Sequence, residues 1–163
     1  MAPVLWYSKS GMKKTILPIL IFLGLFILPV VGLYAQSNQV IDALLLEERA
    51  TFQNSVYLVL SVAGIIPEEA GGEEAIEALE QTDWNIKVKA PEEPIRLGTY
   101  SLLLMKAFDI KGGIFYTLFP SPRYASRELG YKGYIKRGFK AGRYLSGRDA
   151  IKIMGRVVRA QEQ

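Results

Sequence analysis

The residues of this chain that are best suited to chemistry are basic and tyrosine side chains interleaved in its second half. The basic residues there are Arg123, Arg127, Lys132, Lys136, Arg137, Lys140, Arg143 and Arg148, and the tyrosines are Tyr124, Tyr131, Tyr134 and Tyr144. Guanidinium and ammonium groups bind anions, and tyrosine rings pack on the faces of sugars. The pattern therefore predicts a surface for an anionic polymer. The predicted polymer-binding residues are Arg123, Tyr124, Arg127, Arg143 and Arg148.

The charge of the chain changes sign abruptly along its length. Residues 36–93 contain three basic and twelve acidic residues, a net charge of −9, whereas residues 94–163 contain fourteen basic and four acidic residues, a net charge of +10. A cationic half attracts anionic partners through its field. The alternative interpretation is that the two halves face one another in one fold, or only keep its surface soluble.

The residues required for most enzymatic mechanisms are absent from the sequence. The chain contains no histidine and no cysteine, and neither a phosphate-binding glycine loop nor a nucleophile elbow occurs. A carboxylate pair remains, formed by Glu128 and Asp149, as a glycan hydrolase would use. Each has another explanation, because Glu128 lies among arginines on a predicted helix and Asp149 fits a helix cap. We expect no catalytic residues, no metal site and no cofactor.

The first 35 residues have the pattern of a leader peptide. Lys13 and Lys14 precede an apolar run over residues 16–33, and the small residue Ala35 follows. This order predicts a signal peptide cleaved after Ala35, with an uncleaved membrane anchor as the alternative. The lack of cysteine excludes disulfides and a lipid-attachment cysteine. We therefore expect an exported protein of the periplasm or bacterial cell envelope, with one domain over residues 36–163.

The remaining sequence has the periodicity of a small all-α domain. Apolar residues at helical spacing predict helices over residues 40–49, 52–63, 95–108, 124–132 and 146–158. Gly64 is expected to end the second of these helices, and Ser146 with Asp149 is expected to cap the last. A short glutamate-rich helix is expected over residues 73–80. Residues 114–119 are expected to form an apolar loop.

Two stretches of the sequence share the pattern L-x-x-x-G-x-I, at residues 60–66 and 129–135. The apolar residues of the helices over 95–108 and 145–158 also match at a constant offset of 50 residues. Together these matches predict two copies of a helix-loop-helix unit. Unit one is expected over about residues 50–108, with the glutamate-rich helix as an acidic insertion, and unit two over about residues 120–160.

Unit two carries the residues of a known family pattern. Its first helix ends with Leu129, Gly133 and Ile135, its loop contains Gly138 and Phe139, and its second helix follows Leu145 and Ser146. In this order and spacing the segment resembles the S-layer homology domain family. The resemblance implies an all-α fold of helix-loop-helix units, which in that family commonly come in threes and hold a protein onto cell-wall polymers.

These observations predict a non-enzymatic envelope protein that acts as an anchoring or binding module, with an anionic cell-wall polymer as its ligand. The alternative is a protein-interaction subunit of a larger envelope assembly, in which the acidic and basic ends dock against different partners or against copies of the same chain. We expect no nucleic-acid partner, and membrane contact only through the N-terminal segment if it is not cleaved.

Overall fold

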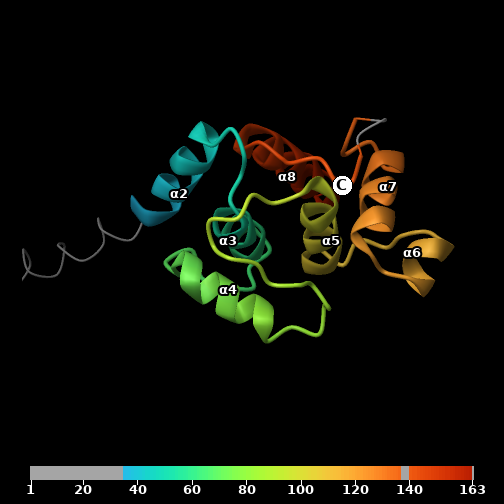
Figure 1. Cartoon of the computed structure of the whole chain (residues 1–163), viewed down its shortest axis with the longest axis horizontal. Coiled ribbons are helices and arrows are strands. Elements are labelled where there is room, and N and C mark those ends of the chain that lie inside the picture. The colour runs from blue at the N-terminus through green and yellow to red at the C-terminus, as the bar shows by residue number, and fades with distance from the viewer. Residues whose placement is uncertain (1–34, 137–139, 163) are drawn as a thin grey trace, which may run out of the picture. The chain divides into compact units, whose positions relative to one another are not determined.

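The computed structural model describes residues 35–136 and 140–162, so the predicted leader peptide lies outside the described residues. Residues 36–163 form one compact unit by their contacts. Its helices are α2 (Ala35–Leu46), α3 (Phe52–Val62), α4 (Gly72–Glu80), α5 (Leu97–Ala107), α6 (Ile114–Leu118), α7 (Pro122–Tyr131) and α8 (Gly147–Gln161) (Figure 1). Within this described part, extended pairing is limited to isolated bridges. The fold class is all-α, as the sequence predicts.

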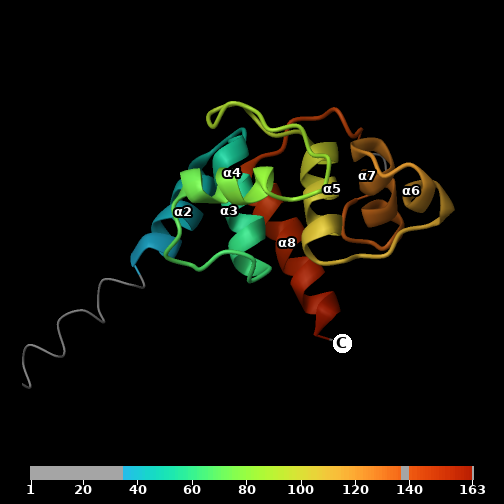
Figure 2. The ribbon, with the colours of Figure 1, turned by 90° about the horizontal axis from the view of Figure 1, so that it is seen from below.

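Helices α3, α5 and α8 form the centre of the unit, and each of them contacts the other two. Figure 2 shows the same three helices from a second side, with α2 near one end of the unit and α6 at the other. Their inward faces supply most of the apolar core, which includes Phe52, Leu60, Leu104 and Val157. The buried residues of α8 recur at helical spacing on one face, whereas α3 and α5 also bury consecutive residues, as helices at the centre of a fold do.

A closed ring of backbone hydrogen bonds joins the segments that lead into the three central helices. The amide of Ala50 donates to the carbonyl of Leu145 at 2.7 Å, Leu145 donates to Ile95 at 3.2 Å, and Ile95 donates to Ala50 at 2.8 Å. All three side chains are fully buried. Each residue stands two positions before the first residue of its helix. The ring therefore gives α3, α5 and α8 equivalent starting points.

The first turns of the three helices are satisfied in the same way. The first amide of each helix donates to a carbonyl in the segment that approaches another member of the ring. These bonds run from Phe52 to Glu93 at 2.8 Å, from Leu97 to Arg143 at 2.8 Å and from Gly147 to Glu47 at 3.0 Å. Helix N-termini present free amides that need such partners. The first amides of the three helices thus hold the segments between helices in place through hydrogen bonds.

The repeated L-x-x-x-G-x-I pattern is a helix-ending structure. Gly64 and Gly133 both have positive φ, +68° and +82°, and the leucine carbonyl accepts a hydrogen bond from the amide five residues later at 2.9 Å in each copy. Such an ending favours glycine because other residues rarely adopt this conformation. The predicted stop of α3 at Gly64 is confirmed. A shared ending is local, however, and does not by itself make α3 the counterpart of α7.

Tertiary contacts instead align α4 with α7. Helix α4 packs on α3 as α7 packs on α5. Ala75 and Leu79 of α4 are buried like Ala125 and Leu129 of α7, at the same offset of 50 residues that relates α5 to α8. The glutamate-rich segment that the sequence suggests as an insertion thus occupies the place of a first helix. Helix α3 occupies the place of a second helix.

Tyr100 of α5 ties two central helices together in the core. Its side chain is fully buried, and its hydroxyl donates to the carbonyl of Ala150 in α8 at 2.9 Å. Burial strongly raises the pKa of this phenol above its ordinary value of 10.0, because a phenolate would lose its hydration. The folded protein therefore keeps Tyr100 neutral at pH values where the unfolded chain ionises it.

This difference predicts a loss of stability at alkaline pH. As pH rises above about 10, the unfolded state releases the Tyr100 proton and the folded state does not, so unfolding becomes more favourable. We expect wild-type protein to lose more free energy of unfolding between pH 8 and pH 11 than the Tyr100→Phe variant does. Urea denaturation at the two pH values measures this. Equal losses in the two proteins would contradict the prediction.

Candidate functional site

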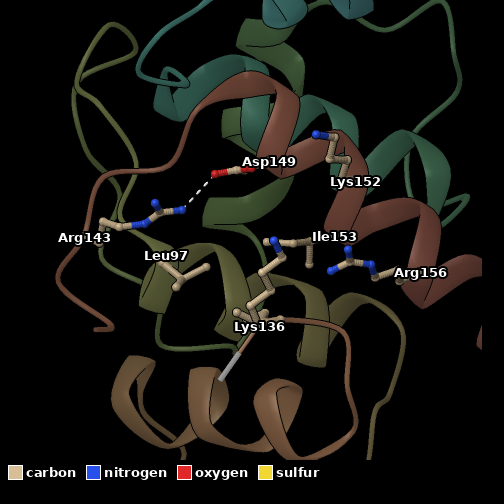
Figure 3. A pocket seen from close by; sticks show the side chains of 8 residues that line it. Leu97, Lys136, Arg143, Asp149, Lys152, Ile153 and Arg156 are labelled. Carbon is tan, nitrogen blue, oxygen red and sulfur yellow. Dashed lines mark hydrogen bonds and ion pairs between the residues drawn. The ribbon is translucent and has the colours of Figure 1, made fainter. Parts of the chain in front are cut away.

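A basic pocket of about 250 Å³ lies between α8, the first residue of α5 and the segment that follows α7 (Figure 3). Its lining residues are Leu97, Ile135, Lys136, Arg143, Asp149, Lys152, Ile153 and Arg156. Four of these eight side chains are cationic and one is anionic. The three aliphatic side chains form an apolar part of the wall, so the pocket offers both charge and a surface for packing.

One face of α8 supplies half of the lining. Three further lining residues of α8 lie three, four and seven positions after Asp149, namely Lys152, Ile153 and Arg156. This spacing places all four on one side of the helix. The start of α8 fixes this face, because the Ser146 hydroxyl accepts a hydrogen bond from the Asp149 amide at 3.2 Å. The helix cap predicted from the sequence is therefore confirmed, and it positions the pocket.

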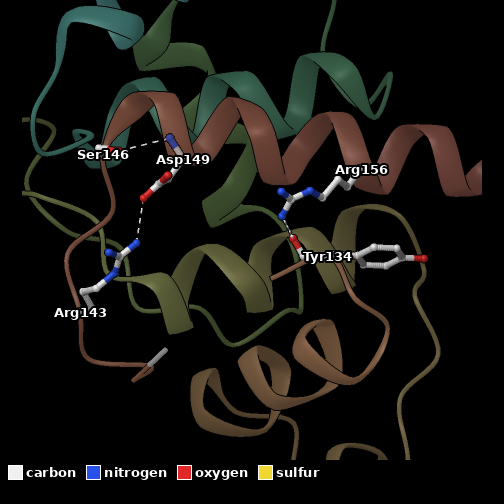
Figure 4. A network of polar contacts seen from close by, with 5 residues as sticks. All are labelled: Tyr134, Arg143, Ser146, Asp149 and Arg156. Carbon is white, nitrogen blue, oxygen red and sulfur yellow. Dashed lines mark hydrogen bonds and ion pairs between the residues drawn. The ribbon is translucent and has the colours of Figure 1, made fainter. Parts of the chain in front are cut away.

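Two polar contacts hold the arginines of the pocket (Figure 4). Arg143 pairs with the Asp149 carboxylate at 2.8 Å, and Arg156 donates to the Tyr134 carbonyl at 2.8 Å. Both contacts join α8 to the segments on either side of residues 137–139. A guanidinium has five N–H donors, so a single contact leaves donors for a ligand on Arg156. The contacts thereby pre-orient cationic groups around the pocket.

The lysines of the pocket differ from the arginines in their contacts. Among the described residues, the side chains of Lys136 and Lys152 make no ion pair or hydrogen bond. Figure 3 shows Lys136 extending toward α8 from the opposite side of the pocket. Among the described lining residues, four cations and one carboxylate, that of Asp149, give a formal charge of +3. A carboxylate or phosphate group with an attached apolar or sugar portion fits this chemistry.

Known proteins give no guide to this site. The chain matches no protein-family model, no curated protein and no solved structure. The function of the pocket is therefore inferred from its own residues.

Three of the predicted polymer-binding residues lie together on α7, outside the pocket. Arg123 and Arg127 are exposed, and Tyr124 is half-buried with its ring stacked on Phe115 at 5.9 Å. Arg127 donates to the Tyr131 hydroxyl at 3.2 Å, and this hydrogen bond raises the pKa of the guanidinium. These side chains form a separate basic and aromatic patch.

The other two predicted residues flank the start of α8. Arg143 lines the pocket, whereas Arg148 is exposed on the first turn of α8 and does not line it. Lys152 and Arg156 were not predicted, although their spacing from Asp149 places all three on one helical face. That spacing is the sequence signal that could have found them. Gly138 and Phe139, on which the family resemblance partly rests, lie outside the described residues.

Tyr144, another member of the interleaved series, has partners inside the fold. The guanidinium groups of Arg49 and Arg96 lie 5.0 Å and 5.1 Å from the centre of its ring. Cation–π contacts of this kind stabilise the packing of exposed aromatic rings. Tyr144 therefore joins segments that precede α3, α5 and α8 and is less suited to stack on a ligand.

In the described part of the chain, no helix has the length and apolar character required to cross a bilayer.

Proposed function

We propose that residues 36–163 act as a non-enzymatic binding module of the cell envelope, which holds an anionic group of a cell-wall polymer in the basic pocket beside α8. The observation that carries this proposal is the excess of four cationic side chains over one carboxylate around a partly apolar cavity. Export rests on the leader pattern of the first 35 residues.

The polymer as ligand class is supported by the distribution of cations beyond the pocket. Arg123 and Arg127 on α7 and Arg148 on α8 extend the basic surface outside the cavity. A single small anion needs only the pocket, whereas a repeating anionic chain gains from several cationic sites. In the S-layer homology family, which unit two resembles, units commonly come in threes, and the three helices that follow the backbone ring are consistent with that arrangement.

Binding to purified cell-wall sacculi tests the proposal. Residues 36–163 contain every core residue of the described fold, so the experiment uses this unit without the leader. We expect co-sedimentation that weakens as salt rises, because ions screen exposed charges. We expect the double variant Lys136→Ala/Lys152→Ala to bind about tenfold more weakly.

Two matched double variants locate the site. Lys106→Ala/Lys111→Ala removes the same number of lysines outside the pocket and is expected to bind within about twofold of wild type. Arg123→Ala/Arg127→Ala tests whether the polymer extends over α7. If the pocket variant and the Lys106/Lys111 variant lose equal affinity, the interaction is only a general charge effect. If the wild-type unit does not bind sacculi, the proposal fails and a protein partner becomes the better explanation.

A further inference from the structure

A second surface of the protein is apolar and exposed. Helix α6 and the residue after it carry Ile114, Phe115, Leu118 and Phe119, whose exposed fractions are 77%, 62%, 64% and 64%. The sequence suggests that residues 114–119 pack as an apolar loop; the structure shows a short helix with these four side chains outside the core instead. Soluble surfaces rarely gather large apolar residues in this way without a partner.

The exposed side chains are presented by a fixed scaffold. Tyr116, on the other side of α6, is buried, and Phe115 stacks on Tyr124 of α7. Gly112 packs so closely on the Tyr116 ring that a Cβ there would approach it to 2.6 Å. These contacts hold α6 against α7, so the apolar side chains project from a defined position. Figures 1 and 2 both show α6 at the far end of the unit from α2.

The charge around α6 indicates the kind of partner. Residues 106–131, which run from the end of α5 to the end of α7, contain four basic and two acidic residues, a net charge of +2. Lys111 and Arg123, which flank α6 in the sequence, are both exposed. The acidic helix α4, with four glutamates among its nine residues, lies away from α6 in both views. An anionic surface therefore attracts the α6 end and repels the α4 end.

We propose that α6 inserts its apolar side chains into the interfacial region of an anionic lipid bilayer. Aromatic and aliphatic side chains with adjacent lysine and arginine are the combination that binds such a surface, because apolar burial and attraction to lipid headgroups act together. The side chains project outward at one end of the unit, which suits a planar bilayer. This contact is independent of the N-terminal segment and of the pocket beside α8.

Sedimentation with lipid vesicles tests the proposal with residues 36–163, because the leader would itself bind lipid. We expect binding to vesicles of phosphatidylcholine with phosphatidylglycerol, and weak binding to phosphatidylcholine alone. The variant Leu118→Ser/Phe119→Ser is expected to bind at least about tenfold more weakly. The control is Leu46→Ser, which replaces an exposed leucine on α2 and is expected to bind like wild type.

A site-specific measurement uses the same unit, residues 36–163. The protein has no cysteine, so Leu118→Cys and Glu74→Cys each allow one environment-sensitive fluorophore, on α6 and on α4. We expect a blue shift with anionic vesicles only for the label at position 118. The proposal is overturned if wild type does not bind vesicles, if the α6 variant binds equally well, or if neither label shifts. Self-association that is lost in the α6 variant, without vesicle binding, would instead assign the surface to a second copy of the chain.

Discussion

The substitution Gly147→Ala is expected to unfold the protein or leave it severely destabilised. Gly147 is the first residue of α8, and a Cβ at this position would lie 1.5 Å from the carbonyl oxygen of Leu44 and 2.5 Å from its carbonyl carbon. Because the obstacle is backbone, no rotation of a side chain relieves it. The end of α2 would have to move and break the hydrogen bond from Gly147 to Glu47. We expect a loss of at least about 3 kcal/mol.

Thermal unfolding followed by circular dichroism measures this effect, with Gly155→Ala as the matched control. Gly155 lies in the same helix, and a Cβ there meets no atom within 4 Å. Alanine favours helix over glycine, so we expect this control to gain about 0.5–1 kcal/mol. The two substitutions are chemically identical. If one lowers the stability and the other raises it, the contact with Leu44 accounts for the difference. A Gly147→Ala protein as stable as wild type would show that the Leu44 carbonyl does not lie against Gly147.

The substitution Phe52→Ala is expected to have the second largest effect. Phe52 begins α3, two residues after Ala50 of the backbone ring, and is fully buried in the core. Removal of a buried phenylalanine loses its transfer free energy and leaves a cavity. We expect the free energy of unfolding to fall by about 3–5 kcal/mol.

Urea denaturation of wild type, Phe52→Ala and Phe119→Ala checks this prediction. Phe119 is 64% exposed, so its replacement removes a similar side chain from the surface, with an expected change within about 0.5 kcal/mol. The same Phe119→Ala protein serves the vesicle experiment as a single-site test of α6. If both variants lost the same stability, Phe52 would not lie in the core that organises α3.

Several features of the fold follow from the sequence because their causes are local. The endings of α3 and α7 depend on Gly64 and Gly133, which adopt positive φ at low cost. The cap of α8 depends on Ser146 and Asp149, only three residues apart. Apolar residues at helical spacing also predict the all-α class. Such signals are contained within a few consecutive residues and need no knowledge of distant contacts.

The site could be predicted only in part. The sequence predicts a basic surface that includes Arg143, which lines the pocket, but the structure puts three of the five predicted residues on α7, outside the pocket. Lys152 and Arg156 were not predicted because they are separated from the tyrosine-rich series in the chain. The pocket exists because α8 lies beside Ile135 and Leu97, which come from other elements. Amino-acid composition alone does not specify that these elements pack together.

The sequence by itself determined most of the helical segments, though not α6, and also where several helices end and which half of the chain is cationic. Only the tertiary structure decided that α4 is the counterpart of α7. It also decided that α3, α5 and α8 start from one ring of backbone hydrogen bonds. The ring joins Ala50, Ile95 and Leu145 through backbone amides and carbonyls, groups that almost every residue type carries. Side-chain patterns therefore do not reveal it, and only the folded chain brings these three residues together.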